Sequence, residues 1–144
     1  MAAFAPADVV NNNATANTLA DVTGLSFDVT SGVRYWFRFI IPYTAAAATT
    51  GSRWSINGPA TTLLFYRSTY TLTVTSETLN AALTAYNLPV TCNATSVAAG
   101  SVAFIEGVVQ PSANGIVIAR FASEVTLSAI TAKAGAMVDF QALP

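Results

Sequence analysis

RYWFRFII, at residues 34–41, is the densest apolar stretch of the chain, and its side chains alternate with the two-residue period of a β-strand. We predict that it forms the central strand of the fold. One face would be wholly apolar and belong to the core, with Tyr35, Phe37, Phe39 and Ile41. The other face would consist of Arg34, Trp36, Arg38 and Ile40. This mixture of two cations with two large apolar side chains suits contact with another subunit.

The segments next to this strand carry further β signals. The central strand should end at Pro42, which lacks the N–H that a central ladder needs. Residues 43–50 (YTAAAATT) are read as a loop, although four consecutive alanines also favour a helix. Residues 52–57 (SRWSIN) predict a strand with Trp54 and Ile56 on one face. Residues 62–75 predict a second long β-rich stretch, with a break near Ser68.

The rest of the chain is also β-rich, with one ambiguous region. Residues 19–29 and 136–141 alternate as strands, and residues 101–125 predict a hairpin around the turn PSANG. Residues 76–86 could form a short helix capped by Ser76 or a strand followed by a loop, and the sequence leaves both open. Residues 1–18 lack periodicity and predict an extended arm.

These signals predict an all-β fold, an antiparallel β-sandwich or jelly roll of about seven to nine strands. Turn residues recur roughly every 8 to 12 positions, and no alternation of strands and helices suggests a parallel sheet. The chain of 144 residues is read as one domain over residues 19–144, preceded by the arm at residues 1–18.

Charged residues make up only 9% of the chain, where a typical soluble domain has about 25%. A surface with so few charges suggests that much of it is buried in an assembly. The alternative explanation is a soluble Thr- and Ala-rich domain that tolerates a low charge content. The net charge of −1 offers no basic stripe for phosphates, so direct nucleic-acid binding is not expected. No window of 18 apolar residues and no secretory signal are present, so no membrane contact is expected either.

The sequence offers little catalytic chemistry. It has no histidine, which removes the Ser-His-Asp and Cys-His arrangements. Paired carboxylates could still converge, as Asp21 with Asp28, or as Glu106 with Glu124 or Asp139. Cys92 is read as a small buried or loop residue. We therefore expect no enzymatic activity, no catalytic residue, no cofactor and no metal site.

Aromatic and arginine side chains are the remaining candidates for binding. Five aromatic residues could form a sugar-stacking patch: Tyr35, Trp36, Trp54, Tyr66 and Tyr70. Aromatic residues on strands are more often found in the core or at a subunit interface. Arginine suits subunit interfaces because it stacks on rings and forks to carboxylates. The candidate subunit interface consists of Trp36, Arg38, Arg34, Arg53, Tyr66 and Arg67. The carboxylates that could pair with these arginines across subunits are Asp28, Glu77, Glu106, Glu124 and Asp139.

Three segments carry a family resemblance: NNNATANTLADVTGLSFDVTSGVRYWFRFIIPY, GSRWSINGP and NGIVIARFASEVTLSAITAKAGAMVDF. They resemble a β-rich module of tailed-bacteriophage structural proteins, found as a small virion protein and at the ends of fibre-like proteins. The similarity spans roughly residues 11–141. It implies a homotrimeric jelly roll, loosely like the heads of tumour necrosis factor and complement C1q, and it implies no enzymatic activity.

This resemblance implies a virion location, with synthesis in the host cytoplasm. The short chain lacks a shaft-forming region, which favours a capsid decoration (cement) protein on the capsid exterior, bound to the major capsid protein at capsomer junctions. The alternative is a tail or fibre-tip protein that contacts tail proteins or a host receptor or glycan.

Overall fold

The computed structural model describes all of residues 1–144 and forms a β-sandwich of eleven strands without a helix. The strands are β1 (Ala2–Phe4), β2 (Val9–Asn11), β3 (Ala20–Val29), β4 (Arg34–Ala45), β5 (Ser52–Asn57), β6 (Thr61–Thr73), β7 (Ser76–Leu83), β8 (Ser101–Pro111), β9 (Gly115–Ser123), β10 (Ile130–Ala132) and β11 (Met137–Leu143). The all-β prediction is confirmed. The strand number exceeds the expected range because β1, β2 and β10 have only three residues each. No helical segment is present that could cross a membrane.

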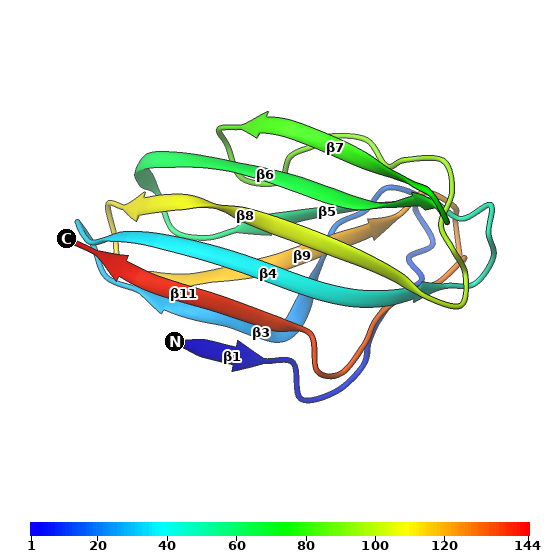
Figure 1. The fold of residues 1–144 in the computed structure, drawn as a ribbon, viewed down its shortest axis with the longest axis horizontal. Coiled ribbons are helices and arrows are strands. Elements are labelled where there is room, and N and C mark those ends of the chain that lie inside the picture. The colour runs from blue at the N-terminus through cyan, green and yellow to red at the C-terminus, as the bar shows by residue number, and fades with distance from the viewer.

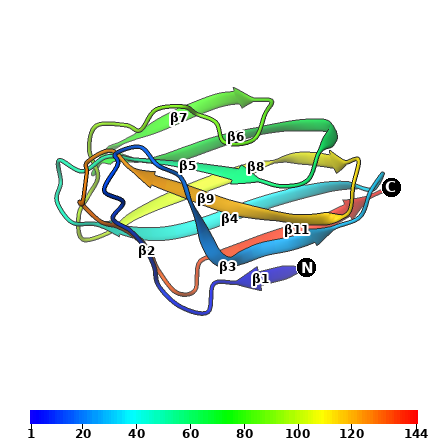
Figure 2. The same ribbon diagram turned by 180° about the vertical axis from the view of Figure 1, so that it is seen from behind.

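Two antiparallel sheets form the layers of the sandwich (Figures 1 and 2). The large sheet has the order β1-β11-β4-β8-β6-β7, and β10 joins it by pairing with β4 and β2. The small sheet has the order β3-β9-β5. β4 pairs with β11 on one side and with β8 on the other, so the predicted central strand is a central strand of the large sheet.

The chain crosses repeatedly from one sheet to the other. β3, β5 and β9 belong to the small sheet, whereas β4, β6 and β8 belong to the large one. The predicted hairpin over residues 101–125 is therefore wrong, because β8 and β9 do not pair and the turn between them links the two layers. Both strands bury one face in the same core, so their sequences alternate in the same way whether the strands pair in a hairpin or lie in different sheets. β6 and β7 form the hairpin of the fold.

The inward face of β4 forms the centre of the core, as predicted. Phe37, Phe39 and Ile41 are fully buried, and Tyr35 is 9% exposed. Phe27 of the small sheet packs on this face, with its ring centroid 5.9 Å from that of Phe37 and 6.2 Å from that of Phe39. Aromatic side chains bury the largest apolar areas, so this cluster contributes strongly to the cohesion of the two layers.

A second aromatic group fills the other half of the core. Trp54 of β5 stacks on Phe121 of β9, with 5.0 Å between ring centroids, and Tyr43 of β4 lies 4.7 Å from Trp54. The indole nitrogen of Trp54 donates a hydrogen bond of 3.0 Å to Ser52 Oγ, so its one polar atom is satisfied. The predicted inward face of β5, with Trp54 and Ile56, is confirmed.

β4 does not end at Pro42, contrary to the prediction from the sequence. The strand runs to Ala45, and Pro42 pairs in register with Val102 of β8. The carbonyl of Pro42 accepts a hydrogen bond of 2.9 Å from the backbone N–H of Lys133, in the connection between β10 and β11. Because the N–H and C=O of a strand residue point to the same side, the missing donor faces this connection and not a strand. Proline is tolerated at a strand position where its missing N–H has no ladder partner to bond.

The ambiguous segment at residues 76–86 forms strand β7 over Ser76–Leu83 and then a loop. β7 pairs with β6. The local sequence is compatible with either a helix or a strand, and the pairing with β6 selects the strand. The expected break near Ser68 is a register shift in this pairing, while β6 itself continues from Thr61 to Thr73. The N-terminal arm contains β1 and β2, which pair with β11 and β10.

Candidate functional site

Four ionisable side chains lie side by side across the outer face of the large sheet, the face turned away from the small sheet. The register places Asp139 of β11 beside Arg38 of β4, Arg38 beside Glu106 of β8, and Glu106 beside Arg67 of β6. Residues opposed in this way have Cβ atoms about 5 Å apart and point to the same face. The signs therefore alternate strictly from strand to strand. We call these four residues the charged row.

Apolar side chains flank the charged row on both sides along the strands. In one direction the residues in register are Met137, Ile40 and Phe104, and in the other they are Trp36, Val108 and Phe65. Phe65 is 49% exposed, and the other five are partly exposed. Strands whose outer face meets water usually alternate with polar residues. This face instead carries an apolar row on each side of the charged row, and aromatic and arginine side chains of this kind are enriched at protein interfaces.

Two contacts on the outer face orient the side chains of the charged row. The guanidinium carbon of Arg38 lies 5.2 Å from the centroid of the Phe104 ring, which is a cation–π distance. The indole nitrogen of Trp36 donates a hydrogen bond of 3.3 Å to Glu106 Oε1. Arg38 and Glu106, the two central members of the row, are thus each held against an aromatic side chain at the surface.

The charged row is mostly unpaired within the chain. Asp139 Oδ1 lies 3.4 Å from the amino group of Met1, at an exposed position. Arg38, Glu106 and Arg67 take part in no ion pair, although each has an opposite charge on the neighbouring strand. Apart from the hydrogen bond that Glu106 Oε1 accepts from Trp36, their charged groups are therefore open to groups outside the chain.

Two hollows lie on this face and share Arg67 and Glu106 in their walls. The first, of about 350 Å³, is lined by Arg38, Arg67, Thr69, Glu77, Phe104 and Glu106. The second, of about 330 Å³, is lined by Trp36, Phe65, Tyr66, Arg67, Ala81, Ala82, Glu106, Gly107 and Val108. Depressions beside exposed rings and charges can receive the side chains of a partner, as hot-spot pockets do.

The structure divides the six predicted interface residues into two groups. Arg34, Trp36, Arg38 and Arg67 point outward from the large sheet, as the alternation predicted for the first three. Arg34 donates hydrogen bonds of 3.3 and 3.1 Å from Nε and Nη2 to Gln110 Oε1. The remaining two residues of the set, Arg53 and Tyr66, lie inside the subunit and cannot contact a partner from there.

Arg53 is only 8% exposed and faces backbone carbonyls of the same chain. Its Nη1 donates hydrogen bonds of 3.2 and 2.6 Å to the carbonyls of Asn87 and Pro89, and Nη2 donates one of 3.1 Å to the carbonyl of Asn17. Its Nε has no partner. Burial lowers the pKa of the guanidinium from its usual value. The sequence alternation cannot show this, because the loop after β7 covers the side of β5 that would otherwise face water.

Tyr66, on β6 of the large sheet, also bonds to the loop that follows β7. Its hydroxyl donates a hydrogen bond of 2.7 Å to the carbonyl of Ala85, and Ser55 Oγ lies 3.2 Å away. Burial raises the pKa of this phenol. Arg53 and Tyr66 therefore fasten the loop that follows β7 to both layers.

The aromatics considered for a sugar-stacking patch do not gather on the surface. Tyr35, Trp54, Tyr66 and Tyr70 are buried, and only Trp36 lies on the outer face. The alternative position for these four aromatics, the core, is therefore confirmed. Trp36 belongs to the outer face described above.

Among the acids considered as catalytic pairs, Glu106 and Asp139 share the charged row, where Arg38 of the intervening strand separates them. Asp21 and Glu124 have other partners. Asp21 pairs with Arg120 at 2.8 Å, and Glu124 Oε2 accepts a hydrogen bond of 3.1 Å from the backbone N–H of Gly51. No group of three or more Cys, Asp or Glu side chains lies close enough to hold a metal ion. Cys92 is partly buried, and burial raises the pKa of its thiol to about 11, so it is protonated at neutral pH.

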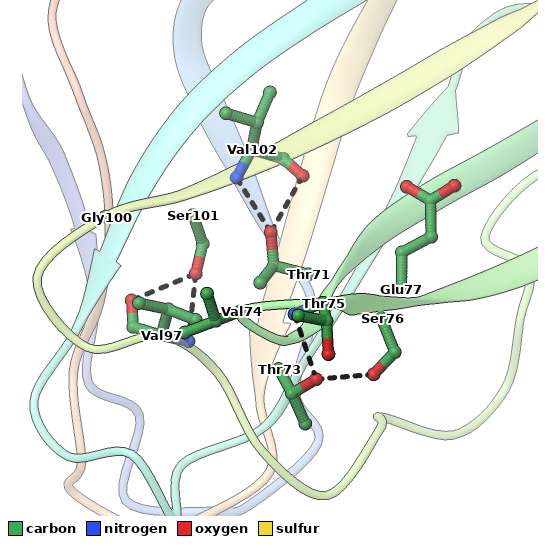
Figure 3. Close-up of a pocket in the computed structure, with 10 residues that line it drawn as sticks. All are labelled: Thr71, Thr73, Val74, Thr75, Ser76, Glu77, Val97, Gly100, Ser101 and Val102. Atoms are coloured by element: carbon green, nitrogen blue, oxygen red, sulfur yellow. Dashed lines mark hydrogen bonds between the residues drawn. The ribbon is translucent and has the colours of Figure 1, made fainter.

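A hollow of about 480 Å³ lies between the β6–β7 turn and the start of β8 (Figure 3). Its hydroxyl groups mostly bond to the chain itself: the Oγ1 atom of Thr71 accepts from the N–H of Val102 at 3.1 Å, and that of Thr73 lies 2.6 Å from Ser76 Oγ. Glu77 provides the one carboxylate in the wall. The wall mixes hydroxyl groups with three valines, and few of its polar groups are free for a ligand.

Sequence reasoning named Glu106 and Asp139 as possible partners of the arginines and as a possible carboxylate pair, and it did not name Phe104 or Val108 as surface residues. The signal was present in residues 101–110, SVAFIEGVVQ, where Phe104, Glu106 and Val108 stand at every second position. What the sequence could not provide was the register that aligns them with β4 and β6.

Comparison with protein families, curated proteins and solved structures found no match to this chain.

Proposed function

We propose that this chain is a non-enzymatic structural subunit of a bacteriophage particle and acts as a decoration (cement) protein on the capsid exterior. The observation that supports it most directly is the outer face of the large sheet, where apolar rows flank charges that have no ion pair within the chain. Such a face is suited to contact with protein. The phage setting rests on the resemblance of the three quoted segments to virion modules.

The loop end of the sandwich offers a second contact surface, which would face the major capsid protein. Residues 12–17, 46–50, 73–75, 94–100 and 125–128 contain no Asp, Glu, Lys or Arg. Val74 is 86% exposed and Leu127 is 68% exposed. Both residues belong to turns at the end where β4, β6 and β9 finish (Figure 1).

Hydrogen bonds between these loops make the end a connected platform. Thr50 Oγ1 lies 2.6 Å from Ser128 Oγ, and Ser96 Oγ donates to the carbonyl of Thr50 at 2.7 Å. The N–H of Leu127 donates to the carbonyl of Asn13 at 3.0 Å. Loops fixed to one another lose little conformational entropy on binding, which favours association.

In this proposal, a homotrimer sits across capsomer junctions and adds buried area between them. A standard protein interface buries about 1,600 Å² in total. Many copies around one head act together, because each bound copy restrains the same shell and the contributions combine through avidity. The shell then resists the pressure of the packaged DNA better than the capsid protein alone.

The test uses heads assembled without this protein and purified chain added back. We expect hundreds of bound copies per head and a higher temperature for DNA release. Val74→Asp and Leu127→Asp should weaken binding to heads, while Ile116→Asp, an exposed apolar residue at the start of β9, is the matched control. Heads that release DNA at the same temperature with and without the bound chain would contradict the cement role.

A tail or fibre-tip protein that binds a host receptor or glycan is the second candidate. The hydroxyl-lined hollow favours it, because Glu77 makes no ion pair there and could accept hydrogen bonds from sugar hydroxyls. Loss of adsorption with intact heads, together with only a few dozen copies per particle, would support this candidate over the cement protein.

A further inference from the structure

We propose that copies of this chain associate through the outer face of the large sheet about an axis parallel to strands β4 and β8. Arg38 of one copy then pairs with Glu106 of its neighbour, and Asp139 pairs with Arg67. The occupant of the face is a second copy of this chain, an inference that rests on the structural role proposed above.

The order of the charges selects this arrangement. From β11 through β4 and β8 to β6 the signs are negative, positive, negative and positive, for Asp139, Arg38, Glu106 and Arg67. A rotation about an axis parallel to the strands, between β4 and β8, keeps each residue at its height but reverses the left-to-right order. A reversed row presents positive to negative at all four positions. The face is therefore complementary to itself under this rotation.

The other in-plane rotation fails on electrostatic grounds. An axis that runs along the charged row, perpendicular to the strands, keeps the left-to-right order. Arg38 would then oppose Arg38 of the neighbour, and Glu106 would oppose Glu106. Like charges brought together in a partly desolvated interface are strongly unfavourable and suppress wrong arrangements. The charge pattern thus discriminates between two ways of stacking the same face.

The apolar rows agree with the axis that the charges select. The same rotation places Ile40 of β4 opposite Phe104 of the neighbour's β8, because these two residues lie in register on either side of the axis. It also places Trp36 opposite Val108. In both cases a large ring meets a smaller aliphatic side chain, which suits close packing.

The available area is adequate for a stable contact. The large sheet is six strands wide along its main path. At about 4.8 Å between strands and about 3.4 Å per residue, eight residues of length give a face on the order of 800 Å². A standard interface uses about 800 Å² of each partner. The outer face therefore matches the size that one specific protein contact needs.

The same pairs arise in a dimer and in a ring. In a two-fold dimer the whole face stacks on its copy. In a homotrimer the β11–β4 half of one copy meets the β8–β6 half of the next, and a three-fold axis parallel to the strands again keeps each residue at its height. Arg38 opposite Glu106 and Asp139 opposite Arg67 are thus expected in both, and the measured mass distinguishes them.

The decisive experiment mixes two charge variants of the full chain. Arg38→Glu with Arg67→Glu makes the row entirely acidic, and Glu106→Lys with Asp139→Lys makes it entirely basic. Each variant alone should need at least a tenfold higher concentration than the native chain to associate, measured by light scattering after size exclusion. An equimolar mixture should associate again, because acidic rows then face basic rows.

The mixture also separates association from effects inside one subunit, since neighbouring charges within a chain cannot be repaired by mixing. Asp28→Lys is the matched control, because Asp28 is exposed on the small sheet and outside the face. A second variant, Arg38→Glu with Glu106→Arg, keeps all the proposed pairs opposite and should associate like the native chain. Circular dichroism melts establish that each variant is folded.

Either of two results would overturn the pairing: charge variants that associate as strongly as the native chain, or a mixture that stays monomeric at concentrations where the native chain associates. A native chain that stays monomeric at all concentrations also overturns it. The proposed function is tested separately, since a monomer that binds and stabilises heads refutes this inference alone. Mixed variants that co-assemble but never bind heads refute the cement role alone.

Discussion

Arg53 tests most sharply how the interior of this protein is held together. The sequence pattern assigned Arg53 to a subunit interface, whereas the structure places its guanidinium among three carbonyls, at 3.2, 2.6 and 3.1 Å. Arg53→Met keeps most of the aliphatic stem and removes the donors. We expect the variant to lose stability as a monomer, with no direct effect on association.

The size of this loss follows from the three hydrogen bonds. A hydrogen bond to a charged group contributes about 1.5–3 kcal/mol net, and a buried carbonyl left without a donor costs about 1–3 kcal/mol. The variant also no longer has to desolvate a guanidinium, the burial that lowers the pKa of Arg53, and this offsets part of the loss. Three such bonds sum to about 4.5–9 kcal/mol, and the desolvation cost that the variant avoids is on the order of several kcal/mol, so we expect a net destabilisation of about 3 kcal/mol.

Urea unfolding measured by tryptophan fluorescence provides the assay. With a slope of about 2 kcal/mol per M, the midpoint should fall by about 1.5 M. Arg34→Met is the matched control, because Arg34 is exposed on the outer face, and it should change stability by less than about 0.5 kcal/mol. The reasoning is refuted if Arg53→Met unfolds at the native midpoint, or if its effect disappears when the protein is diluted to the monomer.

Three further predictions concern the core, the thiol and the outer face. Phe39→Ala should cost about 3–5 kcal/mol, because a fully buried ring leaves a cavity between the layers, and calorimetry should show a much lower Tm. Burial raises the pKa of Cys92 from 9.0 to about 11, so the folded state binds this proton more tightly than the unfolded state. Its contribution to stability is complete below pH 9 and is lost as the pH rises to about 11; unfolding titrations of Cys92→Ala should therefore depend less on pH in that window, and an equal slope would contradict the assignment. Trp36→Ala should weaken association roughly 30-fold, or about 2 kcal/mol, as a buried tryptophan at an interface does, while leaving the monomer's urea midpoint within about 0.5 M of the native value.

The charged row differs in its effect from a surface salt bridge. Exposed ion pairs contribute little to stability, typically 0 to about 1 kcal/mol. Arg38, Glu106 and Arg67 make no ion pair within the chain, so they add little to folding. Their proposed effect is on specificity, because opposed charges decide which rotation of two copies is allowed.

The inward and outward faces of β4 could be predicted from the sequence because strand periodicity is a local property. Phe37 and Phe39 point inward for the same reason that Trp36 and Arg38 point outward: successive side chains of any strand alternate. The all-β class followed from the same signal repeated along the chain. The arginines and Trp36 of the outer face were therefore within reach of sequence reasoning.

Pairing between strands was beyond the sequence because no local signal specifies it. β8 and β9 resemble a hairpin in pattern and turn residues, yet they lie in different sheets, since sheets packed face to face are only about 10 Å apart and a short turn can cross that gap. Arg53 was misplaced for a related reason. Its strand is covered on the outer side by a loop more than thirty residues further along the chain, to which it donates hydrogen bonds.

The sequence by itself determined that this protein is built from amphipathic strands, that it carries few charges and that Trp36 and Arg38 share an outward face. Only the tertiary structure decided that Asp139, Arg38, Glu106 and Arg67 stand in one row. These residues are up to about one hundred positions apart, and antiparallel pairing of four strands is what brings them into register. A shift of any strand by one residue would turn its charge into the core, so burial of the opposite face is the physical reason that the row exists.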